Sequence, residues 1–166
     1  MTGFDTSRHA RRGGPPRMQP AMSDIIAVTP FQVRVTVRLS DLDPQLHVNG
    51  AAYVQFTDHA RFACVEAAGV SVEALLADRF GPVNLETTTR YHHELRIGDT
   101  VDVTCSWIWG AGRTYRVTHE LRLPNGTLAA EVEQLSGMLD LETRRLIADP
   151  AEQWRSRATA PELLGL

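Results

Sequence analysis

Lysine is absent from this sequence, in which all 17 basic residues are arginine. The chain therefore has no side-chain amine for Schiff-base chemistry and no lysine for a phosphate-binding P-loop. Cysteine is scarce as well, because Cys64 and Cys105 are the only two. Both lie within apolar patterns, which indicates buried thiols in a reducing compartment and not a disulfide framework. We therefore expect a cytoplasmic protein.

Long hydrophobic runs are also missing. No apolar stretch approaches the roughly 18 residues that a membrane-spanning helix needs, so we expect no membrane association. The formal net charge is −3, and the chain lacks the basic stripe that marks a nucleic-acid-binding surface. The apolar share of 43% and the charged share of 22% are typical of a globular protein. At 166 residues the chain is long enough for one domain with its own core.

Three regions differ in composition. Residues 1–24 mix arginine, glycine and proline without a hydrophobic period, which predicts a disordered tail. Residues 25–149 carry regular apolar patterns and form the expected domain. Residues 150–166 form a C-terminal tail in which we expect one helical turn, near 152–157, before the chain frays.

The first half of the domain predicts one strand followed by a long helix. Apolar residues alternate with polar ones from Phe31 to Leu39, as in a half-buried strand. Asn49 is a suitable N-cap for a helix over about 50–68, and apolar residues then recur at helical spacing. Several of them are alanines, which lets the helix lie close to its neighbours. A short second helix follows at about 72–79.

The second half predicts an antiparallel meander. Glycine-rich and Asn-Gly turns separate runs with a period of two residues. In the last run the apolar phase changes between Val132 and Leu135, which predicts a bulge. The expected strands span 83–96, 101–109, 115–123 and 127–141. One long helix beside such a sheet is an α+β arrangement.

The densest group of reactive side chains lies between the first strand and the long helix. Asp43 and His47 stand just ahead of Gly50, the first expected helical residue. A helix N-terminus presents unpaired backbone N–H groups and partial positive charge, which suit an oxyanion. A free aspartate is ionised at neutral pH, and a thiol is a good leaving group. A carboxylate beside a helix N-terminus therefore suits the hydrolysis of a thioester. Asp-Pro turns and Asn caps also occur commonly in loops and at helix starts that have only a structural role.

The pattern Asp41-x-Asp43-x-x-x-His47-Val48-Asn49-Gly50-x-x-Tyr53 resembles the signature of hotdog-fold acyl thioesterases. It is similar both to the 4-hydroxybenzoyl-CoA thioesterase family and to the plant acyl-ACP thioesterases. The segments 90–99 and 125–130 resemble the same families, so the resemblance covers about residues 31–149. It implies the hotdog fold, in which an antiparallel sheet of about five strands wraps around one long central helix.

The resemblance also implies catalytic roles. Asp43 stands where the family has its catalytic aspartate, which acts as nucleophile or as general base on water. Gly50 stands where the first helical amide polarises the thioester carbonyl, and relatives often have asparagine there. His47 and Gln45 stand where the acyl-ACP branch has a catalytic histidine and an asparagine, and the glutamine is a departure from that pattern.

The remaining expected site residues contact substrate or shape the site. Asn49 and Tyr53 match positions of the motif that orient the loop and the helix. Arg113, beside a glycine-rich turn, falls where relatives contact coenzyme A phosphates, and a guanidinium suits that role. We therefore group Gln45, Asn49, Tyr53 and Arg113 as the expected substrate-binding set.

Other reactive residues are weaker candidates. Some relatives place a catalytic acid on the long helix, where Glu66 is the alternative to Asp43. His92 and His93 are adjacent strand residues that should point to opposite faces, so they cannot chelate one metal together. We expect neither a metal nor a cofactor. Trp107 and Trp109 are expected in the core or at a subunit contact.

The leading interpretation is hydrolysis of an acyl thioester carried on coenzyme A or acyl carrier protein. The resemblance also implies a homodimer joined sheet to sheet, and often a dimer of dimers. One alternative is a regulatory or binding protein that holds acyl-CoA without cleaving it. Another is a hydratase of the same fold, although we find no motif for its catalytic residues. The acyl group itself is not specified by the sequence.

Overall fold

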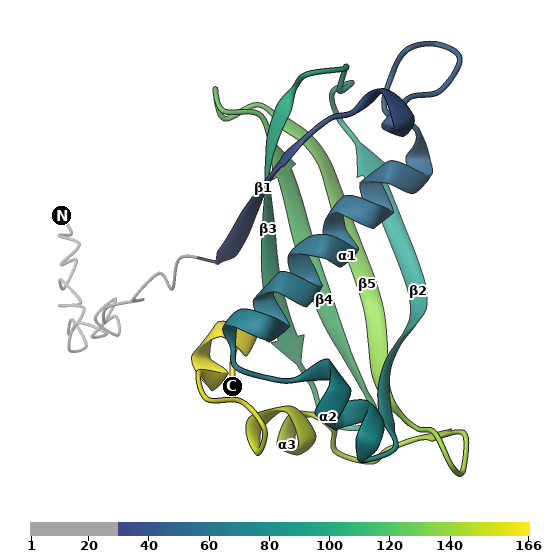
Figure 1. Cartoon of the computed structure of the whole chain (residues 1–166), viewed down its shortest axis with the longest axis vertical. Helices are drawn as coiled ribbons and strands as arrows, with labels where there is room; N and C mark the ends of the chain where they lie inside the picture. The colour runs from purple at the N-terminus through teal and green to yellow at the C-terminus, as the bar shows by residue number, and fades with distance from the viewer. Residues whose placement is uncertain (1–29) are drawn as a thin grey trace, which may run out of the picture.

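The computed structural model describes residues 30–166, so the expected tail at 1–24 and the expected domain start at 25 lie outside the described residues. The helices are α1 (Gly50–Ala67), α2 (Val72–Ala77) and α3 (Pro150–Arg155), with short 3-10 helices η1 (Leu39–Asp41) and η2 (Pro161–Leu164). The strands are β1 (Phe31–Thr36), β2 (Phe80–Tyr91), β3 (Thr100–Trp109), β4 (Thr114–Arg122), β5 (Leu128–Asp140) and β6 (Arg145–Leu146) (Figure 1).

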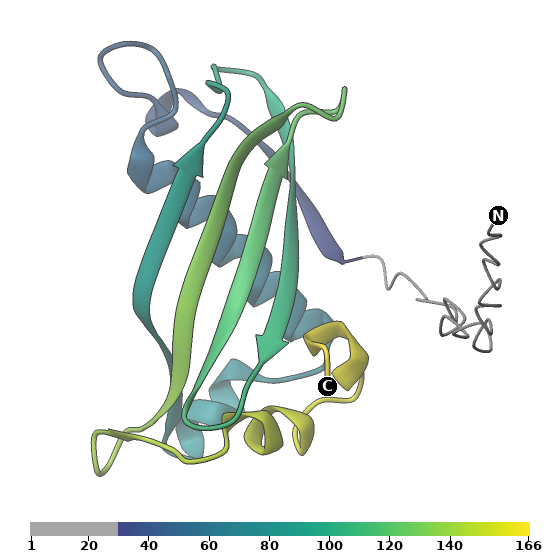
Figure 2. The ribbon, with the colours of Figure 1, turned by 180° about the vertical axis from the view of Figure 1, so that it is seen from behind.

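The strands form one antiparallel sheet. Its five long strands lie in the order β1-β3-β4-β5-β2, and the short β6 pairs with β5. Views from the front and from behind show α1 running along one face of this curved sheet (Figures 1 and 2). The expected α+β arrangement, with about five strands around one long helix, is confirmed.

Alternation of burial explains why the central strands form. In β3 every second residue is buried from Val101 to Trp107, and β4 repeats the pattern from Tyr115 to Leu121. The strands expected at 101–109 and 115–123 are therefore confirmed. The strand expected at 83–96 corresponds to β2, which begins earlier and ends at Tyr91.

The helix α1 begins where its N-cap predicts. The side-chain oxygen of Asn49 accepts a hydrogen bond from the Ala52 amide at 3.0 Å. The helix packs mainly on β3 and β1 through a face that includes Phe56, Ala60 and Cys64. Because Ala60 is fully buried, its small side chain lets the helix backbone approach the sheet closely.

The last long strand corrects one prediction. The bulge expected between Val132 and Leu135 is wrong, because burial alternates without a break through Val132, Gln134 and Ser136. The two polar side chains face inward, and Leu135 lies on the other face. Register shifts occur instead beside Leu85 in β2 and near the start of β5.

The inward polar side chains of β5 have partners. Gln134 donates from its amide to the Asp58 carboxylate of α1 at 3.1 Å, and Arg61 pairs with the same carboxylate at 3.0 Å. Ser136 donates to the side-chain oxygen of Asn84 at 2.8 Å, and Arg61 also donates to that oxygen. Hydrogen bonds therefore connect α1 to β5 and β2.

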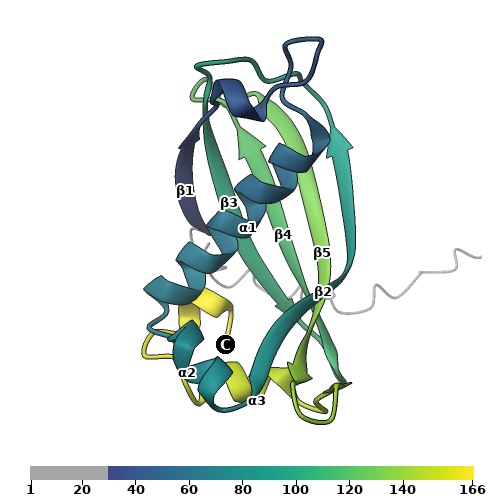
Figure 3. The ribbon, with the colours of Figure 1, turned by 45° about the vertical axis from the view of Figure 1, so that its right-hand side comes forward.

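The C-terminal segment corrects a second prediction. We expected residues 150–166 to fray after a single helical turn, but α3 is followed by η2 and both contribute to the core. Trp154 is 1% exposed and Leu164 is fully buried. The Trp109 indole donates to the Leu164 carbonyl at 2.6 Å. This segment closes the end of the molecule that carries the C-terminus of α1 (Figure 3).

The tryptophans and cysteines lie as expected. Trp107 is buried and its ring stacks on Trp109 and Tyr115, with centroids 5.7 and 5.4 Å apart. The expectation that Trp107 belongs to the core is confirmed. Cys64 and Cys105 are buried free thiols. Across residues 30–166 no helix has the length and apolar content needed to cross a membrane.

Buried His119 should make the fold sensitive to acid. Its Nδ1 lies 2.8 Å from the Thr104 carbonyl, and burial lowers its pKa from 6.5 to about 4. Between pH 6.5 and about 4 the unfolded chain therefore binds more protons at this histidine than the folded chain does. The contribution of His119 to the free energy of unfolding is complete above about pH 6.5 and is lost as the pH falls to about 4. We expect this group to remove about 3 kcal/mol from the free energy of unfolding across that window.

Urea unfolding at several pH values measures this effect. Asp58 and Arg61 are the charged neighbours of the His119 ring. His119→Asn leaves both of them in place and keeps a donor near the Thr104 carbonyl. Any change in the pH dependence of stability therefore comes from the histidine. The variant should have a shallower loss of stability between pH 6.5 and 4 than the parent. His93→Asn, at an exposed position, is the matched control and should retain the parental slope. An unchanged slope in His119→Asn would contradict the prediction.

The cap of α1 is a second determinant of stability. Asn49→Ala removes the acceptor of the Ala52 amide and also the donor to the Asp41 carbonyl, 2.8 Å away. We expect a loss of about 1–2 kcal/mol in the free energy of unfolding. Asn49→Asp keeps the acceptor and should lose less. Equal losses in chemical denaturation would show that the cap contributes little.

Candidate active site

The loop between η1 and α1 is closed on itself by backbone contacts. Leu42 and Val48 form an isolated antiparallel bridge, and the Asp43 amide donates to the His47 carbonyl at 2.8 Å. Leu46 turns the chain with a φ of 64°, a left-handed conformation that is uncommon outside glycine. Asp43 and His47 are therefore held side by side at the base of a tight turn.

The carboxylate of Asp43 is oriented by this loop. Its Oδ1 accepts hydrogen bonds from the amides of Gln45 at 2.8 Å and His47 at 3.2 Å. No protein group among residues 30–166 donates to Oδ2. One oxygen therefore fixes the side chain and the other remains available to a ligand or a water molecule.

The start of α1 lies beside this carboxylate. Asn49 caps the helix, and both its backbone amide and its side chain donate to the Asp41 carbonyl, at 2.9 and 2.8 Å. The Gly50 amide has no hydrogen-bond acceptor in the described part of the chain. The first turn of a helix leaves such N–H groups unpaired, with partial positive charge around them.

Asp43 and Gly50 line one open cavity of about 490 Å³. Its walls come from the loop, from the first turn of α1 and from the end of β2, which lie together at one end of the molecule (Figures 1 and 3). The lining residues are Asp43, His47, Val48, Gly50, Tyr53, Tyr91, His92, His93 and Glu94. Asp43, with its free carboxylate oxygen, and Gly50, with its unpaired amide, thus line the same cavity.

His47 is part of a charged chain at the cavity. Its Nε2 lies 2.9 Å from one oxygen of Glu94, and Arg96 donates to the other oxygen at 2.6 and 2.9 Å. These hydrogen bonds from Arg96 hold the pKa of Glu94 below its usual value. The same Nε2 also lies 3.5 Å from the Arg96 guanidinium, so the imidazole is in contact with both members of the Glu94–Arg96 pair.

Two tyrosines also line the cavity. The rings of Tyr53 and Tyr91 meet edge to face, with centroids 5.0 Å apart and planes at 77°. Tyr53 is 3% exposed, and burial raises its pKa to about 12. Its ring is therefore a neutral, fixed support, whereas Tyr91 is exposed toward the cavity.

The other expected substrate-binding residues do not line the cavity. Gln45 is exposed and takes part through its backbone amide, and Asn49 acts behind the cavity as the helix cap. Arg113 follows the turn between β3 and β4, at the opposite end of the sheet from the loop (Figure 2). Its guanidinium donates to the Leu146 carbonyl. Within one chain, Arg113 and the cavity are not brought together.

The prediction that His92 and His93 point to opposite faces of a strand is wrong. β2 ends at Tyr91, and the amides of both histidines donate to the carbonyl of Ala129, at 2.8 and 3.0 Å. Both residues line the cavity. His92 is paired with Glu131 at 2.7 Å.

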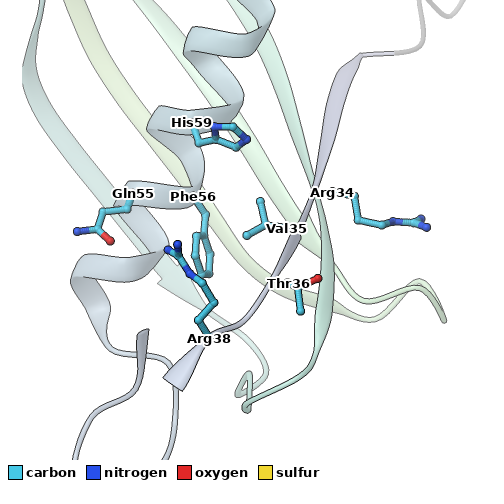
Figure 4. Close-up of a pocket in the computed structure, with 7 residues that line it drawn as sticks. All are labelled: Arg34, Val35, Thr36, Arg38, Gln55, Phe56 and His59. Atoms are coloured by element: carbon cyan, nitrogen blue, oxygen red, sulfur yellow. The ribbon is translucent and has the colours of Figure 1, made fainter. Parts of the chain in front are cut away.

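Glu66 lies far along α1 from this site. It lines a separate cavity of about 450 Å³ near the C-terminal end of the helix. A further cavity, of about 420 Å³, lies between β1 and α1 (Figure 4). There Arg34 is paired with Asp102 at 2.7 Å and points away from the helix. The cavity between β1 and α1 has no carboxylate in its lining. The Glu66 cavity also includes Glu73 and the start of the short helix α2, which Ser71 caps.

Sequence reasoning gave no role to Glu94, Tyr91 or His93. The segment 90–99 resembles the thioesterase families, but the sequence alone does not reveal which of its side chains reach the helix start. Their proximity follows from the pairing of β2 with β5 and from the Val48 amide, which donates to the Leu95 carbonyl at 2.9 Å. The resemblance was therefore the only available signal.

Solved structures with a similar fold include proteins described as thioesterases. The probable thioesterase YbaW from Escherichia coli is 23% identical, with a TM-score of 0.65, over 71% of this chain and 89% of that one. A hypothetical protein from Staphylococcus aureus, solved in complex with CoA, is 23% identical, with a TM-score of 0.71, over 82% and 84%. A 1,4-dihydroxy-2-naphthoyl-CoA thioesterase from Synechocystis is 15% identical, with a TM-score of 0.70, over 77% and 94%.

At these identities the likeness shows the fold, and the expected hotdog fold is confirmed. No curated protein sequence matches the chain significantly. A family model described as the thioesterase-like superfamily matches residues 37–162, which includes the loop, α1 and every strand after it. On the strength of that match over most of its length, the chain belongs to the thioesterase-like superfamily.

Proposed function

We propose that this protein hydrolyses an acyl thioester carried on coenzyme A or acyl carrier protein, releasing a free acid and a thiol. The observation that carries the proposal is the shared cavity, which both Asp43 and Gly50 line. Membership of the thioesterase-like superfamily supports the reaction class. The neighbour solved in complex with CoA supports a CoA-type carrier.

The Gly50 amide is proposed as the oxyanion donor. When a nucleophile adds to the thioester carbonyl, negative charge develops on its oxygen and must be stabilised. An unpaired amide at the first turn of α1 supplies a hydrogen bond and partial positive charge without any rearrangement. The Asn49 cap holds that turn in place, so the donor is preorganised.

Asp43 is proposed as the group that drives hydrolysis, by one of two routes. As nucleophile, its free oxygen would add to the thioester carbon, the C–S bond would break, and water would then cleave the acyl-aspartate anhydride. As general base, it would take a proton from water while the water oxygen adds to that carbon and the thiolate leaves. The amide hydrogen bonds on Oδ1 orient the side chain for either route. Single turnover in oxygen-18 water, followed by protein mass spectrometry, distinguishes them.

His47 and Glu94 are proposed to assist. In the tautomer that carries its hydrogen on Nε2, the nitrogen beside Glu94, the imidazole would have Nδ1 available to accept a hydrogen bond from the attacking water. The carboxylate of Glu94 would stabilise the ring if it gains a proton during the reaction. Arg96 keeps that carboxylate ionised and in position.

Assembly as a homodimer, or as a dimer of such dimers, is part of the proposal. β2 lies at the edge of the sheet, is 12 residues long and has several exposed residues. An edge strand of that length presents unpaired backbone groups that another strand can join. The cavity is open and includes the end of β2, so a partner at this edge would lie next to it.

A protein that binds acyl-CoA without cleaving it is the second candidate. The conformation of the Asp43 loop favours hydrolysis over this alternative, because two amides orient a carboxylate that simple binding would not need. Tight acyl-CoA binding without release of thiol would favour the binding protein.

Asp43→Asn should abolish most of the activity while leaving the fold intact. We expect the rate of thiol release, measured across a panel of acyl-CoA and acyl-ACP thioesters, to fall by roughly 1,000-fold. The asparagine side chain can neither attack the thioester nor take a proton from water. Glu66→Gln is the matched control, because it alters the other candidate acid, which lies on α1, and it should keep the parental rate. Equal activity in Asp43→Asn and the parent would exclude the proposed role.

Glu94→Gln should lower kcat by about tenfold, since it removes the negative charge that orients and stabilises His47. The effect should vanish in a His47→Ala background, because Glu94 is proposed to act through its charge contact with His47. Glu131→Gln changes an analogous pair with His92 and should not show this coupling. Full additivity of the Glu94 and His47 substitutions in steady-state kinetics would argue against a joint role.

A further inference from the structure

Whereas Tyr53 is buried, Tyr91 is the exposed tyrosine of the cavity. It is the last residue of β2, is 57% exposed and lines the same cavity as Asp43 and Gly50. Its hydroxyl has no hydrogen-bond partner among residues 30–166. Because the exposed ring does not fill the core, packing alone does not explain a tyrosine at this position.

The Tyr91 hydroxyl lies close to Gly50. A Cβ atom added to Gly50 would lie 3.0 Å from the Tyr91 hydroxyl oxygen. Because a Cβ is about 2.5 Å from the nitrogen of its own residue, the phenol oxygen and the Gly50 nitrogen are at most about 5.5 Å apart. One oxygen atom can accept hydrogen bonds of about 2.9 Å from two donors at that separation.

Two features keep the phenol at this place. The Tyr53 ring supports it edge to face, and Tyr53 is itself buried in the core. Tyr91 also pairs in register with Ala130 of β5, which anchors its backbone. The absence of a side chain at Gly50 leaves the space that the hydroxyl occupies.

We propose that the Tyr91 hydroxyl is a second hydrogen-bond donor to the thioester carbonyl oxygen, acting beside the Gly50 amide. This inference rests on the proposed thioesterase function. As the nucleophile adds, the carbonyl oxygen gains negative charge and both hydrogen bonds strengthen. The proton stays on the phenol oxygen, and no bond at Tyr91 forms or breaks. The tyrosine is thus a catalytic residue through contact with the reacting atoms.

Tyr91→Phe tests the proposal because it removes only the hydroxyl. We expect kcat to fall by about 10- to 100-fold, at or below the range measured for a single oxyanion donor elsewhere, with KM changed by less than about threefold. Tyr115→Phe, in the aromatic cluster at the other end of the sheet, is the matched control and should keep the parental kcat. Gly50→Ala should displace the phenol, so adding Tyr91→Phe to it should cause little further loss.

A spectroscopic measurement separates contact with the carbonyl from a structural effect. The probe is an unreactive ketone analogue of acyl-CoA, with a methylene in place of sulfur and carbon-13 at the carbonyl. Its carbonyl stretch should move to lower frequency when bound to the parent protein, and part of that shift should be lost in Tyr91→Phe. The Tyr115→Phe control should show the full shift.

The outcomes distinguish this inference from the proposed function. Hydrolysis by the parent, with unchanged kcat or an unchanged carbonyl frequency in Tyr91→Phe, would overturn the role of Tyr91 and leave the proposed function standing. Binding of the analogue without hydrolysis by the parent would overturn the function, while the frequency still decides whether the hydroxyl meets the carbonyl. Absence of both hydrolysis and binding would overturn both.

Discussion

The free N-terminus of α1 is the constraint on which the site depends. A helix cannot satisfy the amides of its own first turn, and burying them without partners would be costly. Here Asn49 satisfies the Ala52 amide and ties the helix start to the Asp41 carbonyl, while Gly50, whose amide has no acceptor in the described part of the chain, lines an open cavity. The first turn of any helix leaves unpaired N–H groups, and here the residue with such a group, Gly50, lines the same cavity as Asp43.

The surrounding loop makes that placement rigid. Asp43 uses its Oδ1 to hold the amides of two residues that follow it, so the same atom that orients the carboxylate also closes the turn. The Val48 amide donates to the Leu95 carbonyl, which ties the loop to the segment that carries Glu94. Loop, helix and the chain beyond β2 are thus joined by backbone hydrogen bonds, which do not depend on the side chains that do chemistry.

Local patterns predicted the elements well because their causes are local. Alternating burial in β3 and β4 and the cap at Asn49 are each encoded within a few residues. One error is local, because the first strand was expected to reach Leu39 but ends at Thr36, and Leu39 is exposed in η1. The other errors concern relations between distant segments. Gln134 and Ser136 face the interior because Asp58 and Asn84 meet them there, and no pattern within β5 contains that information. Asp43, His47 and Gly50 were close in sequence, whereas Tyr91 and Glu94 reach the cavity through strand pairing. The packing of the C-terminal segment is a long-range relation of the same kind.

The polar contacts in the core bear on the shape of the site. α1 packs on β3 and β1 mainly through apolar side chains, but it meets β5 and β2 through Asp58, Arg61 and their partners. Apolar contacts tolerate small slides, whereas hydrogen bonds fix distance and direction. β2 is an edge strand held on one side by β5, and its last residue forms a wall of the cavity. Polar contacts between α1 and this half of the sheet therefore limit sliding of the helix along β5 and β2, while the Tyr53 ring contacts Tyr91 itself at the helix start.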